Sequence, residues 1–276
     1  MTGIRSCIVA GLLALPLVTA DAQREFGGRN RRNFGGDPNE FYVPPEWQKN
    51  TPYDGRFTFA RIKYRGFSHW SGREGPGWSH DYPRAESHFM RIIREITAMR
   101  PFVETEGTPG GNIIALDDPE LFKYPVAYFS EPGGWFPNEK EIQGMQNYLR
   151  KGGFVIFDDF DGGGMMGDYE HFIDVMKRVL PEARVVDVPE THAIFDSFFK
   201  VDLRLMDRGG GGFNYGRARY LGIFKDNDPR KRIMAIINLN QDIGEYWQWS
   251  DSGFNIAPSN EAYKLGVNYL IYALTH

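Results

Sequence analysis

The sequence predicts an α/β fold, a three-layer sandwich in which helices cover both faces of a mostly parallel sheet. Short apolar runs typical of buried strands alternate along the chain with segments whose apolar residues recur every three or four positions. The run 154–157 (Phe-Val-Ile-Phe) is apolar without interruption, as expected of a central strand that is covered on both faces. Strands that alternate with helices are typical of this architecture.

The first elements follow from local composition. Aromatic and β-branched residues over 57–64 predict a strand, and a loop over 65–83 follows it. The spacing of apolar residues then predicts a helix over 84–99, which Pro101 stops because proline lacks an amide donor. The next apolar run, 126–129, lies between two prolines and suits a buried strand.

The middle of the chain carries clear helix boundaries. Asn138, with Glu141 three residues later, forms a capping box, in which side chains bond free amides of the first helical turn. Gly152 and Gly153 end this helix, because glycine adopts the left-handed closing conformation without steric cost. The central strand over 154–157 follows directly.

The alternation continues to the end of the chain. We expect a helix over 169–180, strands over 185–188 and 233–237, and a closing helix over 261–274. The run 220–224 predicts a further strand, with an antiparallel arrangement as an open alternative. We therefore assign residues 53–276 to a single α/β domain.

The N-terminal segment has the pattern of a cleavable signal peptide. Arg5 gives a short positive region, an apolar stretch runs from Cys7 to Val18, and small residues precede a cleavage point after Ala22. We expect residues 1–22 to be removed near Ala22, which makes the protein periplasmic or secreted, with no transmembrane segment in its mature form. Because Cys7 is the only cysteine, the mature chain would carry no thiol nucleophile, disulfide or cysteine metal site.

Residues 23–52 form a segment rich in glycine, arginine and asparagine between the leader and the domain. The segment shows no apolar periodicity, so we expect a flexible linker; a contact of its arginines with an anionic surface is the alternative. The formal net charge of the chain is −4, which gives nucleic-acid binding no electrostatic support.

Polar residues follow three predicted strands at the point where each strand ends. In open parallel sheets ligands bind beyond the carboxyl ends of the strands, so these residues are expected along one rim. They are Ser130, Glu131 and Trp135 after the first strand, Asp158, Asp159 and Asp161 after the second, and Asn238, Asn240, Gln241 and Asp242 after the third.

The Asp158-Asp159 pair is the strongest candidate for chemistry. Adjacent strand residues point to opposite faces, so one carboxylate should face a helix layer and the other the rim. Close carboxylates raise one another's pKa, which suits acid/base catalysis, and they bind cations such as Mg²⁺ or Ca²⁺ through oxygen. We predict both as catalytic or metal-binding residues; no cofactor is assigned, and a divalent cation is the candidate. The alternative is that one Asp caps the next turn and the other is solvated.

Further residues complete the predicted site. Glu131 and His192, each shortly after a predicted strand, are added as catalytic candidates. Tryptophans in predicted loops beside carboxylates and amides suit the binding of sugar rings, although they also pack loops onto a domain. The ligand-binding candidates are Trp78, Asp81, Trp135, Asp161, Asn238, Asp242 and Trp247.

The segment Gly162–Gly167 matches the G-x-G-x-x-G pattern of dinucleotide-binding turns, with Asp187 twenty residues beyond it. The aspartates before it would repel a pyrophosphate, and the strand that it follows is not the first of the domain. An exported protein is also removed from the dinucleotide pool. We therefore do not assign a nucleotide site.

Three segments carry a family resemblance: residues 61–64 (Arg-Ile-Lys-Tyr), 152–159 (Gly-Gly-Phe-Val-Ile-Phe-Asp-Asp) and 262–268 (Ala-Tyr-Lys-Leu-Gly-Val-Asn). They resemble the bacterial domain of unknown function 4159 family, over nearly the whole domain. That family is similar in fold to class I glutamine amidotransferases and flavodoxin-like domains, so the resemblance implies a sheet of that kind. Amidotransferases carry a nucleophilic cysteine where this chain has Asp158 and Asp159, so glutamine hydrolysis by that route is not expected.

Three functions remain open on these grounds. The first is a non-catalytic exported domain that binds a carbohydrate or an envelope protein through the rim and the aromatic loops. The second is a metal- or carboxylate-dependent hydrolase centred on Asp158 and Asp159, in which one carboxylate holds a cation or activates water and another protonates the leaving group. The third is a scaffold of an envelope assembly, with the basic segment as its tether.

Overall fold

The computed structural model describes residues 50–66, 77–102, 111–160, 167–206, 217–252 and 255–276. The expected leader, nearly all of the expected linker, Asp161 and the glycine-rich motif up to residue 166 lie outside the described residues.

Within the described residues, seven strands form one sheet in the order β2-β1-β3-β4-β7-β6-β5. Strands β2, β1, β3, β4 and β7 run parallel, whereas β6 is antiparallel to both of its neighbours. The five parallel strands follow the 2-1-3-4-5 order of flavodoxin-like sheets, which confirms the predicted fold class. The strands are β1 (Phe59–Lys63), β2 (Gly111–Ala115), β3 (Val126–Ser130), β4 (Phe154–Phe160), β5 (Val185–Asp187), β6 (Arg219–Phe224) and β7 (Ile233–Leu239).

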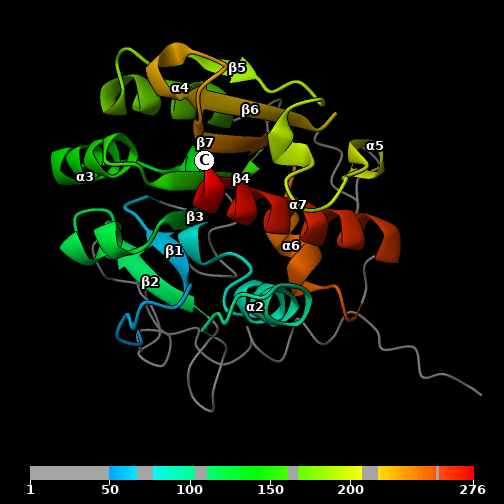
Figure 1. Cartoon of the computed structure of the whole chain (residues 1–276). Helices are drawn as coiled ribbons and strands as arrows, with labels where there is room; N and C mark the ends of the chain where they lie inside the picture. Colours follow the sequence, from blue (N-terminus) through cyan, green and yellow to red (C-terminus); the bar gives the residue numbers. More distant parts are fainter. Residues whose placement is uncertain (1–49, 67–76, 103–110, 161–166, 207–216, 253–254) are drawn as a thin grey trace, which may run out of the picture. The chain divides into compact units, whose positions relative to one another are not determined.

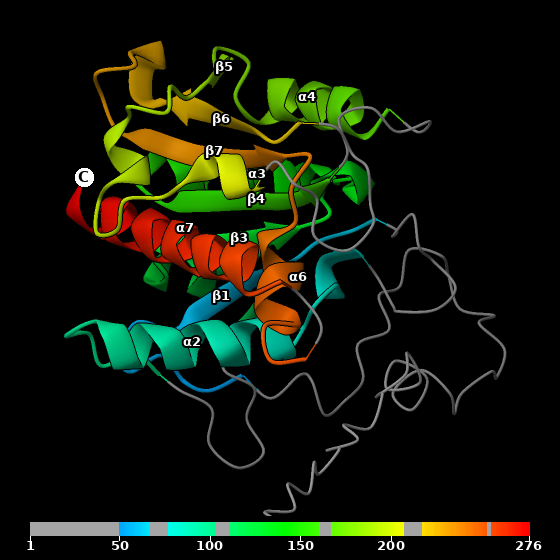
Figure 2. The same ribbon diagram turned by 90° about the vertical axis from the view of Figure 1, so that its right-hand side faces the viewer.

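Helices cover the sheet on both faces. Helices α3 and α4 lie on one face, and α2, α6 and α7 lie on the other (Figures 1 and 2). The predicted capping box of Asn138 and Glu141 opens α3, and Asn255 caps α7 several residues before the predicted start. The helices are α2 (Arg84–Ile96), α3 (Glu139–Arg150), α4 (Asp168–Val179), α5 (Leu203–Met206), α6 (Ile243–Gln248) and α7 (Ile256–Thr275).

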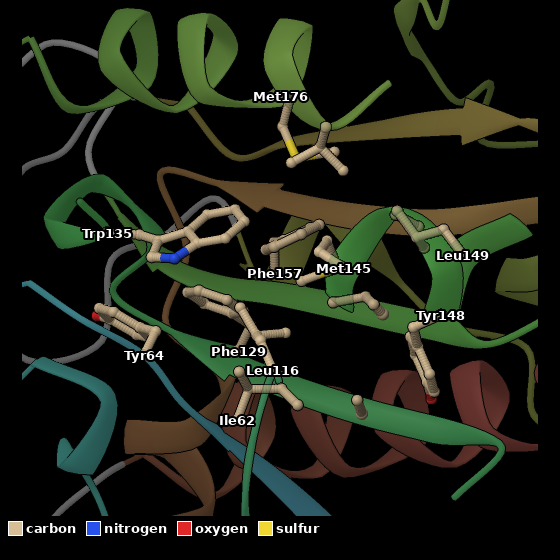
Figure 3. Packing of buried hydrophobic residues seen from close by; sticks show 14 of the residues in the cluster. Ile62, Tyr64, Leu116, Phe129, Trp135, Met145, Tyr148, Leu149, Phe157 and Met176 are labelled. Atoms are coloured by element: carbon tan, nitrogen blue, oxygen red, sulfur yellow. The ribbon is translucent and has the colours of Figure 1, made fainter. Parts of the chain in front are cut away.

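Strand β4 lies at the centre of the core because both of its faces are buried. Phe157 packs with Phe129 in the layer under α3 and α4 (Figure 3), and Val155 belongs to the same cluster. Phe154 and Ile156 face the layer under α2, α6 and α7. Burying one such side chain stabilises the fold by about 1.5–3 kcal/mol, which explains the uninterrupted apolar run.

Strand β2 and the short helices α5 and α6 are absent from the sequence prediction. Strand β2 is a five-residue edge strand that contains the buried Asn112, so it lacks a strong apolar pattern. Helix α6 spans six residues, which is too short for a helical period to show. The prediction that Trp247 lies in a loop is therefore wrong: it lies in α6 and stacks on Phe89, with 4.3 Å between the ring centres. In the described part of the chain, no helix is long and apolar enough to span a membrane.

Candidate metal centre

The carboxyl ends of the parallel strands bring together residues that are far apart in the sequence. Glu131 follows β3, Asp159 lies near the end of β4, and Asp242 follows β7 and caps α6. His80 and Asp81 come from the segment between β1 and α2. These five residues are defined here as the rim cluster.

The Nδ1 atom of His80 lies at the centre of the rim cluster. It is 2.6 Å from Asp159 Oδ2, 3.8 Å from both Asp81 Oδ2 and Glu131 Oε1, and 4.0 Å from Asp242 Oδ2. One ligand atom from each of His80, Asp81, Asp159 and Asp242 lies within 4.8 Å of the other three. An imidazole nitrogen and carboxylate oxygens at such spacing can hold a divalent cation.

Asp81 is the most unusual member of the cluster. The residue is 3% exposed, and neither of its carboxylate oxygens accepts a hydrogen bond from the residues that the structure describes. Burying an ionised carboxylate without donors is costly, and burial raises the pKa of Asp81 to about 7, against the opposing charge of His80. Burial also raises the pKa of Asp242 well above its usual value, and the charges of Asp159 and Asp81 add to this rise. The four carboxylates of the cluster are therefore opposed by a single group that can carry positive charge, His80.

Three members of the cluster have left-handed backbone conformations. The φ angles are +63° at Asp81, +45° at Glu131 and +61° at Asp159. Side chains other than glycine adopt this region rarely, at a cost of about 1–3 kcal/mol each, and such residues concentrate at functional sites. These backbone conformations occur at the three residues whose carboxylates lie within 3.8 Å of His80 Nδ1.

Asp158 serves the fold below the rim instead of joining the cluster. Its Oδ2 atom accepts hydrogen bonds from the Tyr128 hydroxyl (2.6 Å) and from the backbone amides of Ile243 and Gly244 (3.0 Å each). Its Oδ1 atom accepts one from Asn238 Nδ2 (2.8 Å). These four bonds fasten β4 to β3, β7 and α6.

The expectation that the aspartate pair divides between a helix layer and the rim is confirmed by these contacts. Asp158 lies outside the group of four residues whose ligand atoms could hold a cation. Burial raises the pKa of Asp158 to about 6, although the bonds from Tyr128 and Asn238 oppose the rise. Asn238, predicted as a ligand-binding residue, is itself fully buried and accepts a bond from the Tyr269 hydroxyl.

The three described tryptophans of the predicted ligand-binding set are buried. Trp78, Trp135 and Trp247 each have 0% exposure. Trp135 packs on Phe129 in the core, as Figure 3 shows. Their burial matches the alternative in which these rings pack loops onto the domain, because a buried ring has no open face for a sugar.

His192 lies away from the rim cluster. Its ring packs against Phe224, at the end of the antiparallel strand β6, and against Tyr272, near the end of α7. The Tyr272 hydroxyl accepts a hydrogen bond from the backbone amide of Ile233, at the start of β7. His192 therefore lies at the amino ends of the parallel strands, opposite the rim, because the chain turns back after β5.

His80 is the cluster residue that the sequence analysis does not assign. The histidines show no metal-binding spacing, and His80 lies in a long predicted loop. Its position next to Asp81 was the one signal that could have found it. The convergence of this pair with Glu131, Asp159 and Asp242 depends on the order of the strands.

The fold and the rim define an α/β domain with a histidine and four carboxylates gathered at the carboxyl edge of a parallel sheet. Residues 58–274 match the family described as a domain of unknown function, DUF4159, and the chain belongs to that family. The match includes the entire sheet and all five residues of the rim cluster. No curated protein matches the chain.

Proposed function

We propose that this domain is a divalent-cation-dependent hydrolase whose cation is bound by His80, Asp81, Asp159 and Asp242. The observation that carries the proposal is the buried carboxylate of Asp81, which accepts no hydrogen bond from the described residues and lies within 4.8 Å of a ligand atom from each of three other residues. A bound cation would supply the positive partner that this carboxylate needs.

The ligand set favours a transition metal ion. The imidazole nitrogen suits Zn²⁺ or Co²⁺ and the three carboxylates suit Mn²⁺, whereas Mg²⁺ and Ca²⁺ prefer sites made of oxygen alone. We therefore expect Mn²⁺ or Zn²⁺ to bind more tightly than Mg²⁺ or Ca²⁺.

Glu131 is the proposed general base. Its Oε1 atom is 3.8 Å from His80 Nδ1, yet it lies outside the group of four ligand atoms. Two hydrogen bonds fix the backbone of Glu131. Its amide donates to the Asp158 carbonyl (3.1 Å), and its carbonyl accepts a hydrogen bond from the Tyr64 hydroxyl (2.7 Å). A carboxylate beside a bound cation can accept a proton from a water that the cation has acidified, and that water then attacks the substrate.

Unfolding of the protein in the presence of metal ions tests the proposal. A ligand at a hundred times its dissociation constant adds about 2.7 kcal/mol to the free energy of unfolding. We expect this gain with Mn²⁺ or Zn²⁺ in the wild type and its loss in Asp81→Asn and Asp242→Asn. The matched control is Asp174→Asn, because Asp174 is an exposed residue of α4 that pairs with Lys177.

Hydrolysis is then measured on p-nitrophenyl acetate, phosphate and glycoside probes with the stabilising metal. Metal-dependent turnover that the Asp81 and Asp242 variants lose supports the hydrolase. If no metal stabilises the wild type, the cation site is refuted. If a metal binds and no probe is turned over, the rim is a cation site without the proposed hydrolytic activity on these classes of substrate.

A second candidate function, carbohydrate binding, has one observation in its favour. Phe136, on the segment after β3, is 47% exposed and stacks on the ring of His171, with 4.2 Å between ring centres. An exposed aromatic face near the rim can stack on a sugar ring. Binding to a glycan array that Phe136→Ala abolishes would favour this function, and a flat response across the array would oppose it.

Export from the cytoplasm is proposed on the sequence of the first 22 residues. Sequencing the N-terminus of protein recovered from a periplasmic extract tests it, with Gln23 as the expected first residue. An envelope partner is tested by deletion of residues 23–50, which should release the protein from any such assembly.

A further inference from the structure

We propose that Arg61 is a positioning residue for the cation site: it holds the segment that carries His80 and Asp81 in the conformation that brings both residues to the rim. This inference rests on the proposed function above. Arg61 lies in β1, which Figure 2 shows behind α2 and α6.

The guanidinium group of Arg61 is fully buried and bonded on several sides. Its Nε atom donates to the carboxylate of Glu86 in α2, and both side chains are buried. Its Nη1 atom donates to the backbone carbonyls of Trp78 (3.0 Å) and His80 (2.8 Å). The group also lies over the ring of Tyr128, 4.9 Å from its centre. Removing a charge from water costs several kcal/mol, and these contacts offset that cost.

Two of these bonds reach the segment that forms the site. The Trp78 and His80 carbonyls lie on either side of Ser79, so the guanidinium fixes the backbone directly before Asp81. Asp81 has the left-handed φ of +63°, a conformation that persists only where the surrounding structure holds it. Arg61 provides such a hold on the N-terminal side of Asp81.

An ion pair with Glu86 would by itself require neither carbonyl contact. The planar guanidinium presents several N–H donors in a fixed arrangement, so one group can serve the carboxylate and both carbonyls. A lysine ammonium would keep the charge opposite Glu86 but lacks this fork. Arg61 therefore has two separable roles. Its bond to Glu86 neutralises that carboxylate, and its bonds to the two carbonyls position His80 and Asp81, so different variants can test each role.

The experiment compares Glu86→Gln, Arg61→Lys and the double variant Arg61→Met/Glu86→Gln with the wild-type full chain. The double variant removes both buried charges, so it leaves no unpaired ion in the core. Co²⁺ binding is measured by titration calorimetry and by the visible absorption of the bound ion. Metal-free samples are measured by NMR of the imidazole Nδ1 proton of His80, which reports its 2.6 Å contact with Asp159.

We expect Glu86→Gln to bind Co²⁺ like the wild type, because the bonds from Arg61 to the carbonyls remain. The double variant should bind Co²⁺ about 10- to 100-fold more weakly, the usual effect of losing a group that orients a metal ligand, with a changed absorption spectrum. Wild-type affinity and spectrum in a folded double variant would overturn the proposal. If the double variant does not fold, Arg61→Lys decides: weaker Co²⁺ binding supports positioning, and unchanged binding opposes it.

Failure of the cation site itself gives a different result. If the wild type binds no Co²⁺, the proposed function is refuted, and the positioning role is judged from the metal-free spectra. The His80 Nδ1 signal should then be retained in Glu86→Gln and lost or shifted in the double variant, or in Arg61→Lys if the double variant does not fold. An unchanged His80 Nδ1 signal in the folded double variant, or in Arg61→Lys if the double variant does not fold, would overturn the role of Arg61.

Discussion

Replacing Asp81 with asparagine is expected to stabilise the metal-free protein by a margin that grows with pH. Burial raises the pKa of this carboxyl from 3.8 to about 7. Between these values the folded state keeps a proton that the unfolded state releases. The stability that protonated Asp81 provides is therefore complete below pH 3.8 and is lost as the pH rises through about 7.

The size of the effect follows from the shift. One pKa unit corresponds to about 1.4 kcal/mol. Relative to low pH, where Asp81 is protonated in both states, this residue therefore lowers the free energy of unfolding by about 2 kcal/mol at pH 5 and by about 4 kcal/mol at pH 8. Asparagine does not ionise and avoids this cost at every pH. The advantage of Asp81→Asn over the wild type should therefore increase by about 2–3 kcal/mol from pH 5 to pH 8.

Urea unfolding in EDTA at pH 5, 6, 7 and 8, followed by tryptophan fluorescence, measures this difference. Most other titrating groups are common to both proteins, so their contributions largely cancel in the comparison. Asp174→Asn serves as the control, because its exposed carboxyl has a pKa lowered by Lys177 and should show no growing advantage. A difference between Asp81→Asn and wild type that stays constant with pH would refute the reasoning, because Asp81 would then have an ordinary pKa in the folded state.

The remaining predictions separate the fold from the chemistry. Asp158→Asn should lower the free energy of unfolding by about 2–4 kcal/mol, because an amide cannot accept all four hydrogen bonds, while metal-dependent stabilisation remains; loss of metal binding in the folded variant would contradict this. Glu131→Gln should keep metal-dependent stabilisation but lower any hydrolytic rate by about 10²–10⁴-fold, and an unchanged rate would exclude Glu131 as the base. Gly244→Ala should destabilise the protein by about 1–3 kcal/mol in urea unfolding, because its Cβ would lie 2.5 Å from the Tyr128 hydroxyl and 2.7 Å from Asp81 Oδ2; wild-type stability would contradict this close packing.

The two consecutive aspartates show how one sequence feature divides into two uses. Asp158 keeps the alternation of β4 and points into the layer under α6, where four donors meet its carboxylate. Asp159 has a left-handed backbone and lies where the pairing of β4 with β7 becomes irregular, so its side chain turns to the rim. Alternation predicts this division, but the neighbouring strands β3 and β7 and the helix α6 determine which of the two residues has donors.

The sequence alone determined the fold class and most of the element order. Uninterrupted apolar runs such as 154–157, helical periodicity and the Asn138 capping box are local patterns, and the structure has these elements where the patterns place them. The same patterns placed Glu131, Asp159 and Asp242 along one rim, because the carboxyl ends of parallel strands lie at the same edge of a sheet.

Only the tertiary structure decided which of the rim residues meet. It brought His80 and Asp81 to Asp159, left Asp81 without a hydrogen-bond donor among the described residues, and placed His192 at the amino ends of the parallel strands. The physical reason is that secondary-structure patterns act over a few residues, whereas the rim cluster joins side chains from four segments of the chain. Their meeting depends on strand order, on crossover connections and on buried supports such as Arg61, none of which leaves a periodic signal in the sequence.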